Sequence, residues 1–405
     1  MREIFPAPPG HQQLSAPDPE LGRDFADSKA EMLPRPIQIP ESGTGVDPFP
    51  PLKFSDRSDF LTVLRQRVDD YFCTTGQPRR DCPQMYVKTA IILIWFATSY
   101  ASLVFLASTW WQAVPLAIST GLAMAAIGFN IQHDGGHHAY SDYPWINRLA
   151  ALSLDLLGGS SHVWDRKHNS IHHTYSNITG YDDDINIGFL GRLSPHQKRL
   201  KLHRLQHFYL WFLYGFTAIK WQVYDDFRDV VKGQIDGHLF VRPTGWKLMV
   251  FIVGKLIFFS LALVIPMLLC ELSAVLFCYV LASFVQGVTL SVVFQLAHCV
   301  EEAEFPLPDR GTGRMKNAWA VHQVETTVDF ASGNRFVAWL TGGLNFQIEH
   351  HLFPRICHVN YPAISKLVEQ TCREFEIEYV VHKTLFAGVA SHFRWLRRMG
   401  MPDAA

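Results

Sequence analysis

The sequence contains few charged residues. Only 18% of its 405 residues are Asp, Glu, Lys or Arg, whereas soluble proteins contain about 25%. The formal net charge is −1 at pH 7, so the chain has no overall positive field that would attract nucleic acid. Hydrophobic residues make up 48%. This composition excludes a nucleic-acid-binding class based on charge and favours a membrane protein.

Cysteines are few and scattered. The chain has seven, and no two of them form a Cys-x-x-Cys pair. Thiolate zinc sites and disulfide scaffolds are recognised by paired or regularly spaced cysteines. We therefore expect neither kind of site.

The beginning of the chain lacks a regular apolar pattern. Residues 1–53 contain nearly half of the 23 prolines, which predicts a disordered, Pro-rich arm. From residue 54 to 72, apolar residues such as Phe60, Leu64 and Val68 recur at helical spacing with charges between them. This pattern predicts an amphipathic helix, packed on the main domain or lying in the membrane interface.

Charge is absent from long stretches. Residues 89–132 have no charged side chain, and residues 248–297 have only Lys255 and Glu271. A bilayer crossing needs about 20 apolar residues, so each stretch is long enough for two crossings. The predicted spans are 89–108, 112–132, 248–270 and 272–298. Lys255 implies either a side chain that reaches the interface or a short third span.

The distribution of positive charge predicts the topology. Arg79, Arg80 and Lys88 precede the first span, Arg242 and Lys247 precede the third, and the two turns between paired spans have no Lys or Arg. The positive-inside rule places both turns outside and both termini in the cytoplasm. Two moderately apolar stretches, 145–159 and 205–221, are expected to remain peripheral helices.

Histidine is concentrated where the spans end. The clusters are QHDGGHH (residues 132–138), HNSIHH (168–173) and QIEHH (347–351), and His298 lies at the end of the fourth span. Residues four apart share one face of a helix, as His133 and His137 do. Imidazole is a ligand for iron, copper, zinc and nickel. The pattern indicates a metal site at the cytoplasmic surface; the alternative is a set of histidines bonded to backbone or lipid headgroups.

The number of histidines favours two metal ions. Eight candidates exceed the four ligands of a typical zinc site, and the chain lacks the Glu-x-x-His pairs of soluble carboxylate di-iron bundles. We predict an all-α integral membrane protein, with four transmembrane helices in two hairpins and a helical cytoplasmic cap carrying a di-metal histidine site. The membrane domain would span 54–385, and 386–405 would be a C-terminal tail. The candidate ligands are His133, His137, His168, His172, His173, His298, His350 and His351.

The motifs HDGGHH, WDRKHNSIHH and GGLNFQIEHHLFP resemble the three histidine boxes of membrane fatty acid desaturases. A third box that begins with Gln, as here with Gln347, resembles that of the front-end subgroup. Front-end desaturases add a double bond between an existing double bond and the carboxyl end of the chain. The resemblance implies a non-haem centre of two iron ions that uses dioxygen to desaturate an acyl chain carried by coenzyme A or a lipid. It assigns the eight histidines as ligands, with Gln347 as a weaker ligand, directly or through water.

The resemblance also suggests neighbours of the ligands. His138 is a possible ligand that we place in the surrounding layer, and carboxylates at Asp134, Asp182, Asp183, Asp184 and Glu349 are candidates to orient ligand imidazoles. Two departures affect the site: Phe294 occupies a position where relatives often have an amide, beside Gln295, and three residues separate the first two histidines of the second box where many relatives have two. Further residues expected around the centre or substrate are Trp164, Asn169, Gln295, Gln323 and Asn345.

Front-end relatives often carry a fused haem domain with a His-Pro-Gly-Gly motif, which this sequence does not contain. We therefore expect a separate electron donor, a ferredoxin or a cytochrome. A basic cluster that includes Lys198, Arg199, Lys201 and Arg204 would contact coenzyme A phosphates, the donor or anionic lipid headgroups. The alternative functions are an acyl-chain hydroxylase on the same scaffold and a non-catalytic membrane metal-binding protein.

Overall fold

A computed structural model describes residues 51–402 except residues 57 and 236. The predicted Pro-rich arm, residues 1–53, lies outside the described residues apart from its last three. Over the described part, the chain is mostly helical. It contains two short paired sheets: β1 (Gln234–Ile235) is antiparallel to β2 (His238–Leu239), and β3 (Asp329–Phe330) is parallel to β4 (Val381–His382).

Four helices of the described chain are long and apolar enough to cross a membrane. The first comprises α3 (Pro83–Ala101) and η1 (Ser102–Leu106). The second comprises α4 (Trp110–Ile127), the π-helical turn η2 (Gly128–Gln132) and α5 (His133–Gly136). The third comprises α13 (Gly245–Phe259), η9 (Ser260–Val264) and α14 (Ile265–Met267), and the fourth is α15 (Leu272–His298). The predicted fold class, with four long apolar helices and a buried histidine cluster, is confirmed.

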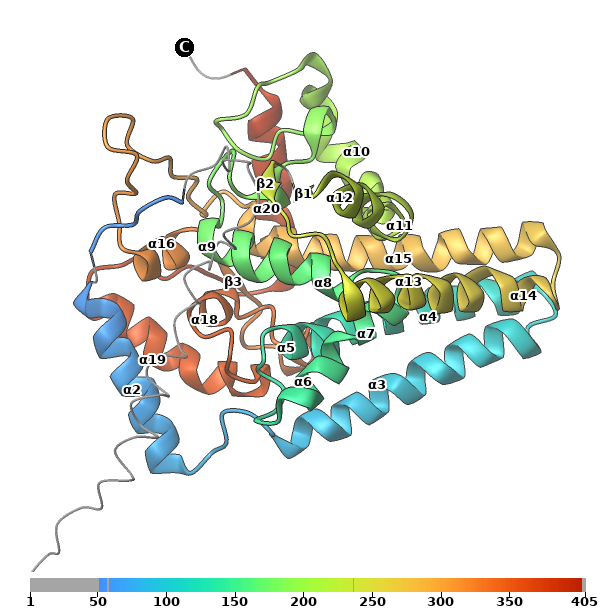
Figure 1. Cartoon of the computed structure of the whole chain (residues 1–405). Coiled ribbons are helices and arrows are strands. Elements are labelled where there is room, and N and C mark those ends of the chain that lie inside the picture. The colour runs from blue at the N-terminus through green and yellow to red at the C-terminus, as the bar shows by residue number, and fades with distance from the viewer. Residues whose placement is uncertain (1–50, 57, 236, 403–405) are drawn as a thin grey trace, which may run out of the picture. The chain divides into compact units, whose positions relative to one another are not determined.

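The spanning helices are arranged as two hairpins. Both hairpin turns, residues 107–109 and 268–271, lie at the same end of the helices, and the histidine-bearing segments lie at the other end (Figure 1). α4 and α15 approach closely at Gly121. A Cβ added to this residue would lie 2.3 Å from the Ala282 carbonyl oxygen. Small residues of this kind allow close backbone packing of membrane helices.

The third span is not short, and Lys255 is paired inside the protein. The third spanning helix begins at Gly245, earlier than expected, and Lys255 is buried within it. Its ammonium group pairs with the Asp226 carboxylate at 2.8 Å and donates to the Gly158 carbonyl at 2.6 Å. A buried charge needs such partners, and the chain supplies them from segments far away in sequence.

The helical cap is formed by the remaining segments. The peripheral stretches predicted near 145–159 and 205–221 are helical and are not among the four helices long and apolar enough to cross a membrane. The cap elements are α2 (Asp59–Thr75), α6 (Pro144–Ala151), α7 (Ser153–Leu156), α8 (Ser161–Trp164), η3 (Asp165–His172), α9 (His173–Tyr175), η4 (Asp183–Ile185), η5 (Gly188–Leu190), η6 (Lys201–Leu205), α10 (Gln206–Leu213), η7 (Tyr214–Phe216), α11 (Thr217–Lys220), η8 (Trp221–Asp225), α12 (Asp226–Lys232), α16 (Trp319–Glu325), α17 (Arg335–Leu340), α18 (Gln347–Leu352), η10 (His358–Asn360), α19 (Tyr361–Glu374) and α20 (Leu385–Gly400).

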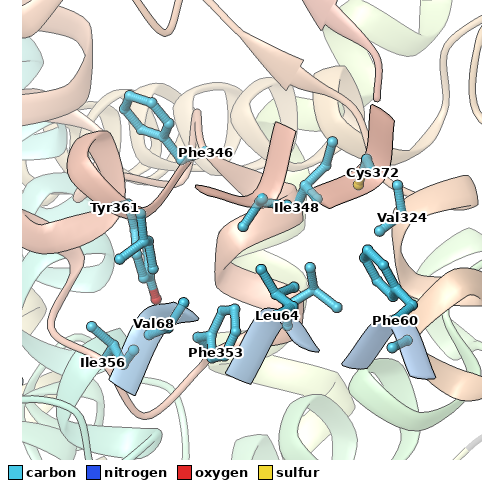
Figure 2. Packing of buried hydrophobic residues seen from close by; sticks show 14 of the residues in the cluster. Phe60, Leu64, Val68, Val324, Phe346, Ile348, Phe353, Ile356, Tyr361 and Cys372 are labelled. Atoms are coloured by element: carbon cyan, nitrogen blue, oxygen red, sulfur yellow. The ribbon is translucent and has the colours of Figure 1, made fainter. Parts of the chain in front are cut away.

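The amphipathic helix near the start packs on the cap. Phe60, Leu64 and Val68 of α2 are buried in a cluster with Ile348 of α18 and Ile364 of α19. Figure 2 shows the α2 side chains directed toward those of α18. The sequence left open whether this helix packs on the main domain or lies in the membrane interface. Its apolar face is buried against α18 and α19, so it packs on the main domain.

The end of the described chain is also packed. The segment predicted as a C-terminal tail, 386–405, contains most of α20. The N-cap of this helix is Thr384, whose side chain accepts a hydrogen bond from the Ala387 N–H. Trp395, Leu396 and Met399 are buried in a cluster with Leu193 and Leu210. The described part of this segment therefore contributes to the core.

Candidate metal centre

The first histidine cluster is built on the end of the second spanning helix. α4 continues through the π-turn η2 into α5, so that His133 and His137 lie on one face one turn apart. The two glycines between them allow close packing. A Cβ at Gly135 would lie 2.6 Å from Ala150, and one at Gly136 would lie 2.2 Å from the Trp164 ring.

The second cluster lies on a π-helix rather than an α-helix. η3 covers Asp165–His172, and His173 follows at once. Single-turn π segments accommodate an extra residue in a helix and occur often at functional sites. The wider turn explains the spacing of this box: His168 is separated by one π-turn from both His172 and His173, so the additional residue does not move the imidazoles off the shared face.

The third cluster lies on a short helix with two opposite faces. In α18, Ile348 and Leu352 are four residues apart and pack in the cluster with α2. Gln347, His350 and His351 occupy the other positions and are buried. Packing of the apolar face against α2 thus directs this histidine pair toward the other two clusters.

All eight candidate ligands come together in one buried site. One group contains His133, His137, His168 and His350, and a second contains His172, His298 and His351. His173 forms a further group with His350 and His351, so it lies between the two. Within each group, the possible ligand atoms are within 4.8 Å of one another.

The imidazole nitrogens point at each other. His133 Nε2 and His168 Nε2 are 3.2 Å apart, and His350 Nε2 and His173 Nε2 are 3.0 Å apart. The Nε2 atoms of His137, His172 and His351 are buried without a hydrogen-bond partner in the described part of the chain. Buried nitrogens without partners are unfavourable. A metal ion that accepted their lone pairs would satisfy these three atoms.

Burial keeps most of these imidazoles neutral. It lowers the pKa of His168, His350 and His351 well below the usual range, because a buried imidazolium loses its hydration and neighbouring imidazoles repel a proton. Burial also opposes protonation of His172, but the Asp182 and Asp184 carboxylates outweigh it and raise the His172 pKa. Neutral imidazole is the form that binds metal.

A second layer fixes the orientation of the histidines. His351 Nδ1 donates to Gln323 Oε1 at 2.7 Å, and His172 Nδ1 lies 3.2 Å from both oxygens of Asp182. His350 Nδ1 lies 3.2 Å from the Tyr361 hydroxyl. When Nδ1 is bonded outward, Nε2 faces the centre, which is the usual arrangement around metal-ligating histidines.

Several predicted neighbours lie at the centre. Gln347 Nε2 is 3.1 Å from His298 Nε2. The Trp164 ring stacks on His168 with centroids 4.5 Å apart, and Asn169 joins the first two boxes by donating to the Gly136 carbonyl at 2.9 Å. Phe294 stacks on His298 with centroids 4.7 Å apart, and the adjacent Gln295 is buried.

Other predicted neighbours are engaged elsewhere. Asp183 pairs with Lys167 at 2.8 Å, and Asp134 accepts from His358 Nδ1 at 3.0 Å. The Glu349 carboxylate accepts from Tyr379 at 3.0 Å. The Asn345 carboxamide oxygen accepts from Thr341 at 3.4 Å, and its amide nitrogen donates to the Ala331 carbonyl at 3.4 Å.

His138 is exposed, has a left-handed backbone with φ of 59°, and belongs to none of the histidine groups found in the described chain. Of the consecutive acids that follow the second box, Asp182 lies closest to a histidine of the centre, and Asp184 lies 3.7 Å from the same His172 Nδ1. The sequence signalled this run but did not distinguish its members. Tyr361 had no sequence signal, because it follows the third box by ten residues and belongs to another helix.

A cavity of about 650 Å³ opens beside the histidines. His133, Trp164, His168 and Gln347 form part of its wall near the centre. Farther on, the wall is largely apolar and comes from several spanning and cap helices. Residues of this apolar wall include Phe129, Leu154, Leu157, Phe216 and Leu290. The shape and lining suit a long apolar ligand that passes the centre.

Four membrane-length helices and a buried cluster of eight histidines define an integral membrane protein with a centre able to bind metal. A family model described as fatty acid desaturase matches residues 108–383. The chain belongs to the fatty acid desaturase family, and it is an enzyme, an oxidoreductase.

Known relatives match most of the chain. It is 37% identical over 350 residues to the sn-1 linoleoyl-lipid 6-desaturase of Synechocystis sp., which covers 86% of this chain and 98% of that protein. It is 38% identical to the protein of the same name from Arthrospira platensis, covering 86% and 94%. It is 35% identical to the acyl-lipid (8-3)-desaturase of Physcomitrium patens, covering 90% and 77%.

Replacement of Asp182 by Asn is expected to weaken metal binding about 10–100-fold, the usual effect of losing the partner of a ligating histidine. The variant keeps the shape of the side chain but removes the negative charge beside His172. Competition with a chelator followed by elemental analysis of the purified protein measures the affinity. Asp142→Asn, which changes an exposed carboxylate, should retain wild-type affinity. Equal affinity in Asp182→Asn and wild type would contradict this role.

Proposed function

We propose that this protein is a front-end acyl-lipid desaturase that inserts a double bond between an existing double bond and the carboxyl end of a lipid-linked acyl chain. The observation that carries the proposal is the histidine site that opens onto a long, largely apolar cavity. The names of the relatives from Synechocystis sp. and Physcomitrium patens, which refer to acyl-lipid substrates, support it, as does Gln347 at the head of the third box.

The centre would hold two iron ions. His133, His137, His168 and His350 would bind one ion, and His172, His298 and His351 would bind the other, with His173 between them. Gln347, 3.1 Å from His298, would complete the second site directly or through a water molecule. When bound, the iron ions supply the oxidising power that, with dioxygen, removes two hydrogens from an alkyl chain.

The protein's own residues would position the chain and exclude water. The apolar wall of the cavity holds methylene groups against the histidines, because burying each one in an apolar pocket is favourable by about 0.8 kcal/mol. Trp164, stacked on His168, would separate the substrate from bulk water on that side. Holding the reacting carbons close and in one orientation accounts for a large part of the rate enhancement of enzymes.

The mouth of the cavity favours a lipid carrier over coenzyme A. Each Lys or Arg that lines the described cavity is already paired with aspartate: Lys167 with Asp183 and Asp184, Lys220 with Asp225, and Arg228 with Asp225 and Asp229. Coenzyme A carries several phosphate charges and would need cations that are free to meet them. A lipid headgroup carries fewer negative charges and would need fewer free cations.

Expression in a host without such an enzyme tests the function. Cells fed linoleate should produce a more highly unsaturated acid in their membrane lipids, with the new double bond on the carboxyl side of the existing ones. His173→Ala should abolish the product, because it removes the histidine that is grouped with a member of each of the other two groups. His196→Ala, at an exposed residue, should not. A hydroxylated acid would instead establish the hydroxylase, and no product from an iron-loaded protein would favour a metal carrier.

We also propose that the centre and both termini face the cytoplasm, where a separate ferredoxin or cytochrome delivers electrons. The turns that carry no Lys or Arg lie at the end of the spans away from the histidines, which supports this orientation. On the side of the centre, Lys198, Lys201 and Arg204 are exposed, and so are Arg397 and Arg398 of α20. An acidic donor would be attracted to this basic surface.

Charge reversal at Lys198 and Lys201 is expected to raise the KM for an acidic ferredoxin several-fold at low salt while leaving kcat nearly unchanged, since rim charges act mainly on association. Arg199 is a poorer target because its guanidinium donates to the Gly400 carbonyl. Lys366→Glu, at an exposed site on α19, is the matched control. Assays in inside-out vesicles should support turnover with added donor. An unchanged KM would refute the docking surface, and turnover only in right-side-out vesicles would refute the orientation.

A further inference from the structure

A small polar cluster lies between the cap segment η8 and the spanning helix α15. Gln222 of η8 is its centre, and its partners are Tyr279, Ser283 and Gln286 of α15. The Tyr279 hydroxyl donates to Gln222 Oε1 at 3.0 Å, and the Ser283 hydroxyl donates to the same oxygen at 3.3 Å. The Gln222 amide donates to Gln286 Oε1 at 3.3 Å and to the Leu157 carbonyl at 3.2 Å. Both ends of this carboxamide are therefore engaged.

The cluster lies between two cavities. Gln222 and Gln286 line the cavity of about 650 Å³ that contacts the histidines. Tyr279 and Ser283 line a second, largely apolar cavity of about 350 Å³. The second cavity extends to the hairpin turns, where Trp110 lines it. The four side chains thus occupy the boundary between a cavity at the centre and one at the far end of the spans.

The second cavity continues the first along the same helices. In the second spanning helix, Gly128 of η2 lines the first cavity and Met124 of α4, one turn earlier, lines the second. On α15, Gln286 lines the first and Ala282, one turn earlier, lines the second. An alkyl chain that extended from the histidines past Gln286 would therefore enter the second cavity.

Contacts with α13 fix the position of this boundary. Lys255 of α13 donates to the Gln222 carbonyl at 3.3 Å and to the Gly158 carbonyl at 2.6 Å. Gly158 has a φ of 87°, and a Cβ there would lie 2.8 Å from Gln222 Cγ. The backbone of η8 is thus fixed against α13, and Gln222 is packed from the side opposite to α15.

We propose that this cluster is the inner end of the acyl-binding cavity and sets the length of chain accepted on the methyl side of the reacting carbons. The inference rests on the proposed function. A methyl end that advanced beyond Gln286 would have to separate Tyr279 and Ser283 from Gln222, and an alkyl group replaces none of those hydrogen bonds. Buried polar groups left without partners are unfavourable, so the cluster discriminates against longer chains.

The experiment compares linoleate with homologues extended at the methyl end by two and by four methylene groups, in cells that express the full-length protein. Wild type should convert linoleate well and the longer chains poorly. Tyr279→Ala removes one wall of the boundary and should raise the conversion of the longest homologue relative to linoleate by at least about tenfold, the smallest effect that a methylene usually has in an apolar pocket. Tyr279→Phe, which removes only the hydroxyl, should shift the ratio in the same direction by less.

Phe277→Ala is the matched control, because this aromatic side chain is on the same helix but is 46% exposed and lines neither cavity. Its chain-length ratio should equal that of wild type. The proposal is overturned if both Tyr279 variants keep the wild-type ratio, or if they accumulate normally and lose conversion of every chain equally. If Tyr279→Ala does not accumulate, Tyr279→Phe decides. Failure of wild type to desaturate linoleate would instead refute the proposed function.

Discussion

The structure depends on collecting eight imidazoles in one buried site. Their nitrogens approach one another to between 3.0 and 3.2 Å at several points, and three Nε2 atoms have no partner in the described chain. Such an arrangement is costly without a cation, because buried nitrogen lone pairs need a hydrogen bond or a metal. A pair of bound metal ions would remove this cost, and the remaining architecture supports the arrangement of the imidazoles.

Each histidine cluster lies on a segment whose conformation is fixed by its own packing or helical structure. α18 is fixed because Ile348 and Leu352 are needed in the core under α2, and this leaves His350 and His351 on the opposite face. Box one continues a spanning helix, and box two lies on the π-helix that follows the short helix α8. Each cluster is therefore set by local structure, and the outer contacts of Asp182, Gln323 and Tyr361 then select the imidazole nitrogen that faces inward.

Much of this was predictable from residue patterns. Uncharged stretches gave the four spanning helices, and spacing of four residues placed His133 with His137. The position of His298 at the end of the fourth span brought it near box two. These features follow from local sequence, because helical geometry and the bilayer thickness fix where such side chains lie.

Other features needed the three-dimensional structure. The π-turn of box two depends on packing rather than on residue type, so the sequence suggested only an α-helix. Asp182 could not be separated from Asp183, since neighbouring acids look alike until the turn η4 directs one to His172 and the other to Lys167. The pairing of Lys255 was not foreseen because its partner, Asp226, lies in a distant segment. The cluster around Gln222 was not foreseen for the same reason.

The central claim is that the histidines hold two iron ions together. Mössbauer spectroscopy of the protein purified from cells grown with iron-57, combined with iron and protein quantification, tests it most directly. We predict two non-haem iron atoms per chain, in nitrogen-rich environments and magnetically coupled to each other. A single iron atom per chain, or full occupancy by zinc in protein that desaturates its substrate, would contradict the account.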